Sequence, residues 1–192
     1  MSQLVCGVGL NDRKHPSWVN GKTTREYSLW HKLIIRCYYL KYHQGNPTYV
    51  GCQASENFKS YFYFYEWVQK QVGFGQKGFD LDKDLLFKGN KLYSEDTCVF
   101  LPRELNTLLT SCKAGRGSLP IGVTAEGKSF RAKCRTDKPS PWVGSFKTPE
   151  EAFRAYKQAK EAFIKRQAEK WKNFLDPRAF AALMAYEVSI TD

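Results

Sequence analysis

A helix start preceded by strand-like segments is the feature that most constrains how this chain can fold. Thr148, Pro149 and Glu151 form the pattern of an N-terminal capping box with proline at the first helical position. The helix that begins there is expected to continue to Trp171. Its apolar positions fall on one stripe and are Ala152, Tyr156, Ala159 and Phe163. A helix with one apolar stripe must pack against another element.

Three strand-like segments come before this helix, at residues 121–124, 129–135 and 142–146. Apolar and basic residues alternate strictly in the second segment, and in a strand such residues point to opposite faces of the sheet. Its apolar row is Phe130, Ala132 and Cys134, and its cationic row is Arg131, Lys133 and Arg135. The apolar row can pack on the helix. The pattern therefore predicts a three-stranded antiparallel sheet with cations about 6–7 Å apart on its open face.

The charge of the chain is concentrated in the same region. The whole sequence has 30 basic and 19 acidic residues, and residues 111–172 alone hold 15 basic and 6 acidic ones. A surface this basic favours a polyanionic partner, and nucleic acid is the most abundant polyanion. A solvated outer face without a partner is the alternative. Three like charges in one row repel each other, which favours an anionic partner.

The same unit is similar to AP2-type DNA-binding domains. The matching segments are Gly122-Val123, Phe130 to Lys133, Val143 to Phe146, Thr148 to Ala152 and Ala155-Tyr156. The resemblance covers residues 118–165 and implies that the sheet contacts DNA. Its DNA-binding residues would be Arg131, Lys133, Arg135 and Trp142, with Lys128, Arg116 and Lys113 as further basic contacts. The turn at 137–141 departs from the family pattern, so no base preference is implied.

The first half of the chain opens with residues 1–26, which are rich in Gly, Asn and Pro and are expected to form a loop. A helix is predicted from Tyr27 because its apolar residues form one stripe. That stripe consists of Trp30, Leu33, Ile34, Cys37 and Tyr38. Asn57 is expected to cap a second helix. Its aromatic residues, between 58 and 67, are interpreted as core, with base stacking or an exposed protein-binding patch as alternatives.

Residues 79–106 follow the order strand, loop, strand, helix, with strands at 79–81 and 97–101 and a helix start at Pro102. This segment resembles the HNH endonucleases of bacteriophages, of the homing type. The resemblance is carried by Leu81 to Asp84, Gly89-Asn90, Tyr93-Ser94, Cys98 to Leu101 and Asn106. Upstream matches are Trp30, Arg36 to Tyr38, Pro47 to Tyr49, Gly51-Cys52, Phe58, Phe62 and Trp67.

The resemblance implies a ββα unit that holds one divalent cation on a scissile phosphate. By alignment, Asp82 is the acidic metal ligand and Asn106 the helix ligand. Hard oxygen ligands suit Mg²⁺ or Mn²⁺. The catalytic set implied in this way is Asp82, Lys83, Asp84 and Asn106.

Lys83 is the point where the sequence departs from the family. It occupies the position of the histidine general base, and Thr97 occupies that of a structural asparagine. A lysine is protonated at neutral pH, so we expect a cation held between Asp82 and Asp84 rather than a base. Asp84 or bulk water could still deprotonate the nucleophile. The only histidines, His15, His31 and His43, lie upstream.

The six cysteines show no paired spacing, and the chain starts without a signal peptide, so reduced thiols are expected. Cys6, Cys37, Cys52 and Cys98 could converge on a structural zinc, but their spacing does not require one. Buried free cysteines are the favoured interpretation.

Together these features predict an α+β protein. The expected parts are an HNH-like ββα-metal domain with added helices (1–110), a basic Gly-rich linker (111–118), an AP2-like domain (119–172) and a helical tail (173–192). The leading hypothesis is a phage homing-type, metal-dependent DNA nickase or endonuclease, without a membrane span, in the cytoplasm of the infected bacterium. One alternative is a DNA-binding or regulatory protein that has lost cleavage. A second is an inhibitor of a host protein on the same scaffold.

Overall fold

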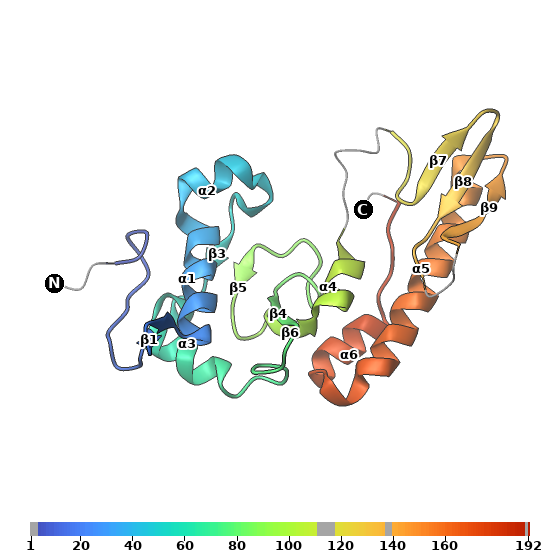
Figure 1. Ribbon diagram of the computed structural model, residues 1–192. Helices are drawn as coiled ribbons and strands as arrows, with labels where there is room; N and C mark the ends of the chain where they lie inside the picture. Colours follow the sequence, from blue (N-terminus) through green and yellow to red (C-terminus); the bar gives the residue numbers. More distant parts are fainter. Residues whose placement is uncertain (1–3, 111–117, 137–139, 191) are drawn as a thin grey trace. The chain divides into compact units, whose positions relative to one another are not determined.

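The structure is a computed structural model of the 192-residue chain, and it describes residues 4–110, 118–136, 140–190 and 192. The chain forms two compact units. The first unit comprises Met1–Pro102 with Phe174–Ala179, and the second comprises Arg103–Asn173 with Phe180–Asp192. Both combine helices with small sheets, which confirms the α+β class (Figure 1). None of the described helices is long and apolar enough to cross a membrane.

The first unit is built around α1 (Arg25–Tyr38). The hydroxyl of Thr24 accepts a hydrogen bond from the Tyr27 amide and so caps the helix. The side chains that this helix buries are Trp30, Leu33, Ile34 and Cys37, as the apolar stripe predicts. The unit continues through α2 (Leu40–Gly45), η1 (Pro47–Tyr49), β3 (Gln53–Ala54) and η2 (Asn57–Lys59) to α3 (Tyr61–Val68).

The cap of α3 differs from the prediction. Asn57 donates its side-chain amide to Glu95, at 2.7 Å, and begins only the short 3-10 turn η2. The hydroxyl of Ser60 accepts from the Tyr63 amide instead and caps the helix. Phe58, Tyr61 and Phe64 have no exposed surface, which confirms that these aromatic residues form core.

Residues 1–26 contain a hairpin that the loop interpretation missed. It pairs β1 (Trp18–Val19) with β2 (Lys22–Thr23) in antiparallel register. The turn between them has positive φ at Asn20 (50°) and Gly21 (72°). Asn-Gly is the sequence typical of such a two-residue turn, so the signal was present in the sequence.

The order strand, loop, strand is present in the first unit. β4 (Phe79–Asp82) pairs with β6 (Val99–Pro102) in antiparallel register, with Asp82 opposite Val99. The intervening β5 (Leu92–Tyr93) pairs in parallel with β3. α4 (Arg103–Leu109) begins one residue after the expected Pro102, and it belongs to the second unit.

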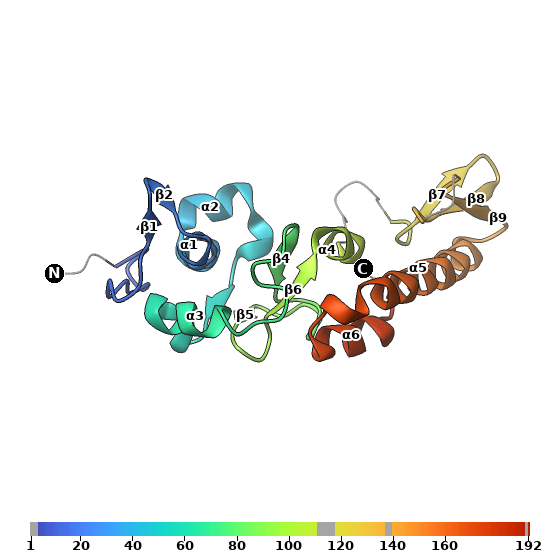
Figure 2. The same ribbon diagram turned by 60° about the horizontal axis from the view of Figure 1, so that its bottom comes forward.

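The second unit contains the predicted sheet and helix. β7 (Val123–Glu126), β8 (Ser129–Lys133) and β9 (Trp142–Phe146) form an antiparallel sheet in that order. The sheet lies along α5 (Pro149–Trp171), as Figure 1 and Figure 2 show. Thr148 and Glu151 form the predicted capping box of α5. The 3-10 turn η3 (Lys172–Phe174) and α6 (Pro177–Met184) follow.

The core between sheet and helix also includes the end of the chain. Its buried residues are Val123, Ala132, Cys134, Ala152, Phe153, Tyr156 and Val188. Val188 is held there because its amide donates to Glu161 at 2.8 Å and its carbonyl accepts from Lys157 at 3.0 Å. The last residues therefore complete the second unit.

Candidate functional site

The outer face of the three-stranded sheet carries the predicted cations. Ala132 and Cys134 are buried in the core against α5, and Phe130 packs against that core. The residues between them, Arg131 and Lys133, lie on the opposite face because strand side chains alternate. One face of β8 is therefore closed by the helix, and the other is open to solvent.

Trp142 is the first residue of the edge strand β9 and lies beside the cations of this open face. It is the cross-strand neighbour of Lys133 and is 46% exposed. The guanidinium carbon of Arg131 lies 5.0 Å from the centroid of a Trp142 ring, and Nζ of Lys133 lies 5.6 Å from it. Cation–π contacts of this kind hold both cations beside the indole. We call Arg131, Lys133 and Trp142 the sheet cluster.

One carboxylate opposes this positive charge. Glu126, the last residue of β7, forms an ion pair with Nε of Arg131, and both side chains are substantially exposed. An exposed pair of this kind contributes only about 0–1 kcal/mol. An anionic ligand could therefore take Arg131 away from Glu126 at little cost.

The other predicted basic residues lie at the margins of the sheet or beyond. Lys128 is exposed in the β7–β8 turn, and Arg135 is exposed two residues after β8. The strand was expected to reach Arg135 but ends at Lys133. The reason is a register shift after Ala132, beyond which the Cys134 amide donates to Pro141. Lys113 and Arg116 lie outside the described residues, as does most of the proposed linker.

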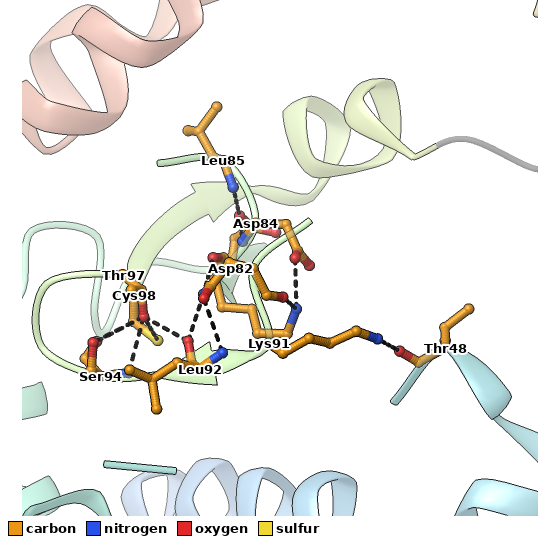
Figure 3. A network of polar contacts seen from close by, with 11 residues as sticks. Thr48, Asp82, Asp84, Leu85, Lys91, Leu92, Ser94, Thr97 and Cys98 are labelled. Atoms are coloured by element: carbon orange, nitrogen blue, oxygen red, sulfur yellow. Dashed lines mark hydrogen bonds and ion pairs between the residues drawn. The ribbon is translucent and has the colours of Figure 1, made fainter. Parts of the chain in front are cut away.

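The predicted metal ligand Asp82 ends β4 in the first unit. Its Oδ1 accepts from the amides of Asp84, at 2.9 Å, and Leu85, at 2.7 Å (Figure 3). Burial raises the pKa of the Asp82 carboxyl. The carboxylate thus shapes the turn after β4 through one oxygen, and Oδ2 is the oxygen through which it could hold a hard cation such as Mg²⁺ or Mn²⁺.

Lys83 points into the protein and is only 7% exposed. Its Nζ donates to Oδ1 of Asp84 and to the carbonyl of Asn90, both at 2.6 Å. The expected contact with Asp84 is therefore present, while the second partner is a backbone carbonyl rather than Asp82. A buried ammonium with these partners is a structural cation.

Thr97 forms hydrogen bonds that tie together the loop before β6. Its hydroxyl accepts from the Ser94 amide at 3.0 Å and donates to the Leu92 carbonyl at 2.7 Å (Figure 3). Its side chain is buried beside Cys98. These bonds connect the start of β6 with β5.

The second proposed metal ligand, Asn106, is half-buried on α4 and belongs to the other unit. The structure therefore does not bring Asp82 and Asn106 together within one unit. Among the residues that the structure describes, no three His, Cys, Asp or Glu side chains gather as a metal-binding group. The donor chemistry of Asp82 fits one ligand position of Mg²⁺ or Mn²⁺.

The described cysteines of the first half are free thiols, and Cys37, Cys52 and Cys98 are buried while Cys6 is partly exposed. Burial raises the pKa of Cys37 to about 12, and it raises that of Cys98 to about 12 as well. Such thiols remain protonated at neutral pH and are unreactive.

The partners of the three histidines do not belong to β4 or β6. His15 stacks on Tyr65, with ring centroids 3.8 Å apart. His31 lies against Tyr27, and Nε2 of His43 lies 2.8 Å from a backbone carbonyl. The described residues thus place no imidazole on the strand that ends at Asp82.

On α3, Phe62 and Tyr63 are each 37% exposed, so part of the aromatic segment faces solvent.

No family model, no curated protein and no solved structure matches this chain. The similarities to AP2-type and HNH proteins therefore rest on the residues quoted for them.

Proposed function

We propose that this protein binds double-stranded DNA through the outer face of the β7–β8–β9 sheet. The observation that carries the proposal is the sheet cluster, in which Arg131 and Lys133 flank the half-exposed ring of Trp142. Cations beside an aromatic ring can meet phosphates while the ring contacts a sugar or a base. The helix behind the sheet keeps this face rigid.

A duplex suits this face better than a small anion does. Strands can enter the major groove, which is about 12 Å wide, and side chains of a strand then reach base edges. Lys128 and Arg135 lie at the margins of the same sheet and extend the positive face. The surplus of basic over acidic residues between 111 and 172 points the same way.

Binding of a fluorescent duplex, measured by anisotropy at several KCl concentrations, tests the proposal. Each phosphate neutralised contributes about 0.9 to the slope of log K against log salt concentration. We expect a slope of several units. A protein that binds no duplex at low salt, or one whose affinity is independent of salt, would overturn the proposal.

The Glu126–Arg131 ion pair leads to the prediction of a variant that binds the duplex more tightly than the wild type. Replacing Glu126 by Gln should free Arg131 for phosphate and remove a repulsion from DNA. We expect affinity to rise about two- to five-fold, which corresponds to the free energy of an exposed pair, and the slope to steepen by about 0.9. Glu56→Gln removes an exposed carboxylate of the first unit and is the matched control. Equal effects of the two changes would show that only net charge matters.

A second candidate function is metal-dependent nicking of the bound DNA at Asp82. The observation that favours it is the second oxygen of Asp82, because Mg²⁺ or Mn²⁺ held there would stabilise charge on a phosphate. The arrangement of Lys83 weighs against it, since a buried, hydrogen-bonded ammonium cannot accept a proton from water. Of the two candidate functions, we therefore favour DNA binding without histidine-dependent cleavage.

Supercoiled plasmid incubated with Mg²⁺ or Mn²⁺ separates the two candidates. If the chain nicks DNA at Asp82, Asp82→Ala should abolish the open-circular product, while binding through the sheet, measured as the slope of log K against log salt concentration, stays unchanged. If the chain only binds, neither protein should give a product above the level of the buffer control. Nicking that persists in Asp82→Ala would place the chemistry at another residue.

A further inference from the structure

The loop between β4 and β5 holds a large apolar side chain out in solvent. Phe87 is 56% exposed, whereas Leu85, two residues earlier, is buried. The Asn90 amide donates to the Phe87 carbonyl at 3.0 Å, which closes a tight turn. Gly89 occupies the turn position that needs a positive φ, here 76°. Phe87 is therefore the first residue of a defined turn.

Hydrogen bonds on both sides close the base of this loop. Nζ of Lys83 donates to Asp84 and to the Asn90 carbonyl, and the Asn90 side chain donates back to the Lys83 carbonyl at 2.9 Å. The same amide donates to the Leu92 carbonyl, and its oxygen accepts from the Leu92 amide at 3.0 Å. At the far end, Nζ of Lys91 donates to the Thr48 carbonyl, at 2.6 Å (Figure 3).

This closure uses the buried ammonium of Lys83, whose partners are the half-exposed carboxylate of Asp84 and the Asn90 carbonyl. A buried charge held by specific hydrogen bonds adds little to stability relative to apolar packing, and its best-supported use is to specify one arrangement. The arrangement specified here is the closed loop that presents Phe87. From 83 to 92 the sequence has three lysines and one acidic residue, Asp84, which pairs with Lys83. The loop that carries the phenyl ring therefore has a surplus of positive charge, which suits an anionic partner.

We propose that Phe87 is a wedge that enters a base step of duplex DNA, and that Lys83 is the positioning residue that holds the wedge in place. Apolar side chains that enter the minor groove partly unstack a step and bend the duplex. The inference rests on the proposed DNA-binding function and adds a contact from the first unit.

Duplexes carrying 2-aminopurine at successive central positions test the wedge, because this base becomes brighter when it is unstacked. The full-length wild-type protein should raise the fluorescence at one step. Phe87→Ala should return the fluorescence to the level of free duplex, while the slope of log K against log salt concentration stays unchanged. Phe87→Leu keeps an apolar side chain and should retain part of the rise. Phe62→Ala removes an exposed phenyl ring from α3 and should leave the rise intact.

Lys83 is tested by the same signal. Lys83→Met fills the buried space without the two hydrogen bonds, so the rise should fall while duplex affinity at low salt stays within a few-fold of wild type. Lys83→Arg, which can still donate to Asp84 and Asn90, should restore part of it. Those readouts separate positioning from general destabilisation, which would lower binding and fluorescence together.

The outcomes also separate this inference from the proposed function. A wild-type protein that binds no duplex overturns both. A protein that binds duplex with no rise at any position, or a Phe87→Ala variant with the full rise, overturns the wedge alone. If the Phe87→Ala variant keeps the full rise, Phe87 would instead be a contact for a protein partner.

Discussion

Replacing Gly122 by Ala should strongly destabilise the second unit and weaken duplex binding with it. Gly122 has φ of +74°, and a Cβ added there would lie 2.1 Å from Cδ2 of Tyr156. Tyr156 projects from α5 and is buried in the core against the sheet, so a shift of its ring would disturb that packing. The backbone strain costs about 1–3 kcal/mol. Overpacking of the core adds about 1–3 kcal/mol. The two costs together, about 2–6 kcal/mol, reach only the lower end of the free energy of unfolding of native proteins, about 5–15 kcal/mol.

Gly127→Ala is the matched control for this substitution. Gly127 also has a positive φ, +58°, but its added Cβ would meet no atom within 4 Å. The control should cost about 1–2 kcal/mol through the backbone alone. Urea unfolding followed by tryptophan fluorescence compares the two variants. If they proved equally stable, the close packing of Gly122 against Tyr156 would be refuted.

The largest expected effect on binding comes from the cations of β8 and its extension. Changing Arg131, Lys133 and Arg135 together to Ala should flatten the slope of log K against log salt concentration by up to about three units, since each lost phosphate contact removes about 0.9. Binding at low salt should weaken correspondingly. Because Lys133 and Arg135 are exposed, and because the ion pair and the cation–π contact of Arg131 both involve exposed side chains, the fold of the unit should survive.

A second triple variant shows whether net charge alone is responsible. Changing Lys41, Lys70 and Lys77 to Ala removes the same charge from exposed positions of the first unit. That variant should keep most of the slope. Equal flattening in both triple variants would mean that long-range attraction, and not contact with the sheet, sets the salt dependence.

Local signals explain why the second unit was predictable. A capping box acts within four residues, and strand alternation is visible in consecutive side chains, so Thr148, Glu151 and the row from Phe130 to Cys134 could be read directly. Trp142, by contrast, was a candidate contact only through the resemblance to AP2-type domains, and its side chain is 46% exposed. The buried stripe of α1 was equally local.

The sequence-based predictions were wrong or incomplete where a residue's partner lies far away in the sequence. Asn57 is a good cap by residue type, but Glu95, far along the chain, takes its side chain. The bond between Lys83 and the Asn90 carbonyl depends on how the whole loop closes, which no spacing rule gives. Val188 joins the core of the second unit from the end of the chain for the same reason. The register shift after Ala132 depends on pairing with β9.

The most direct test of DNA binding by the sheet is an NMR titration of the ¹⁵N-labelled protein with a duplex. The account predicts that the indole N–H signal of Trp142 and the amide signals of Arg131 and Lys133 shift progressively, while signals from the buried face of α5 stay in place. Duplex binding that leaves these three signals unmoved would contradict the assignment of the sheet as the DNA-binding surface.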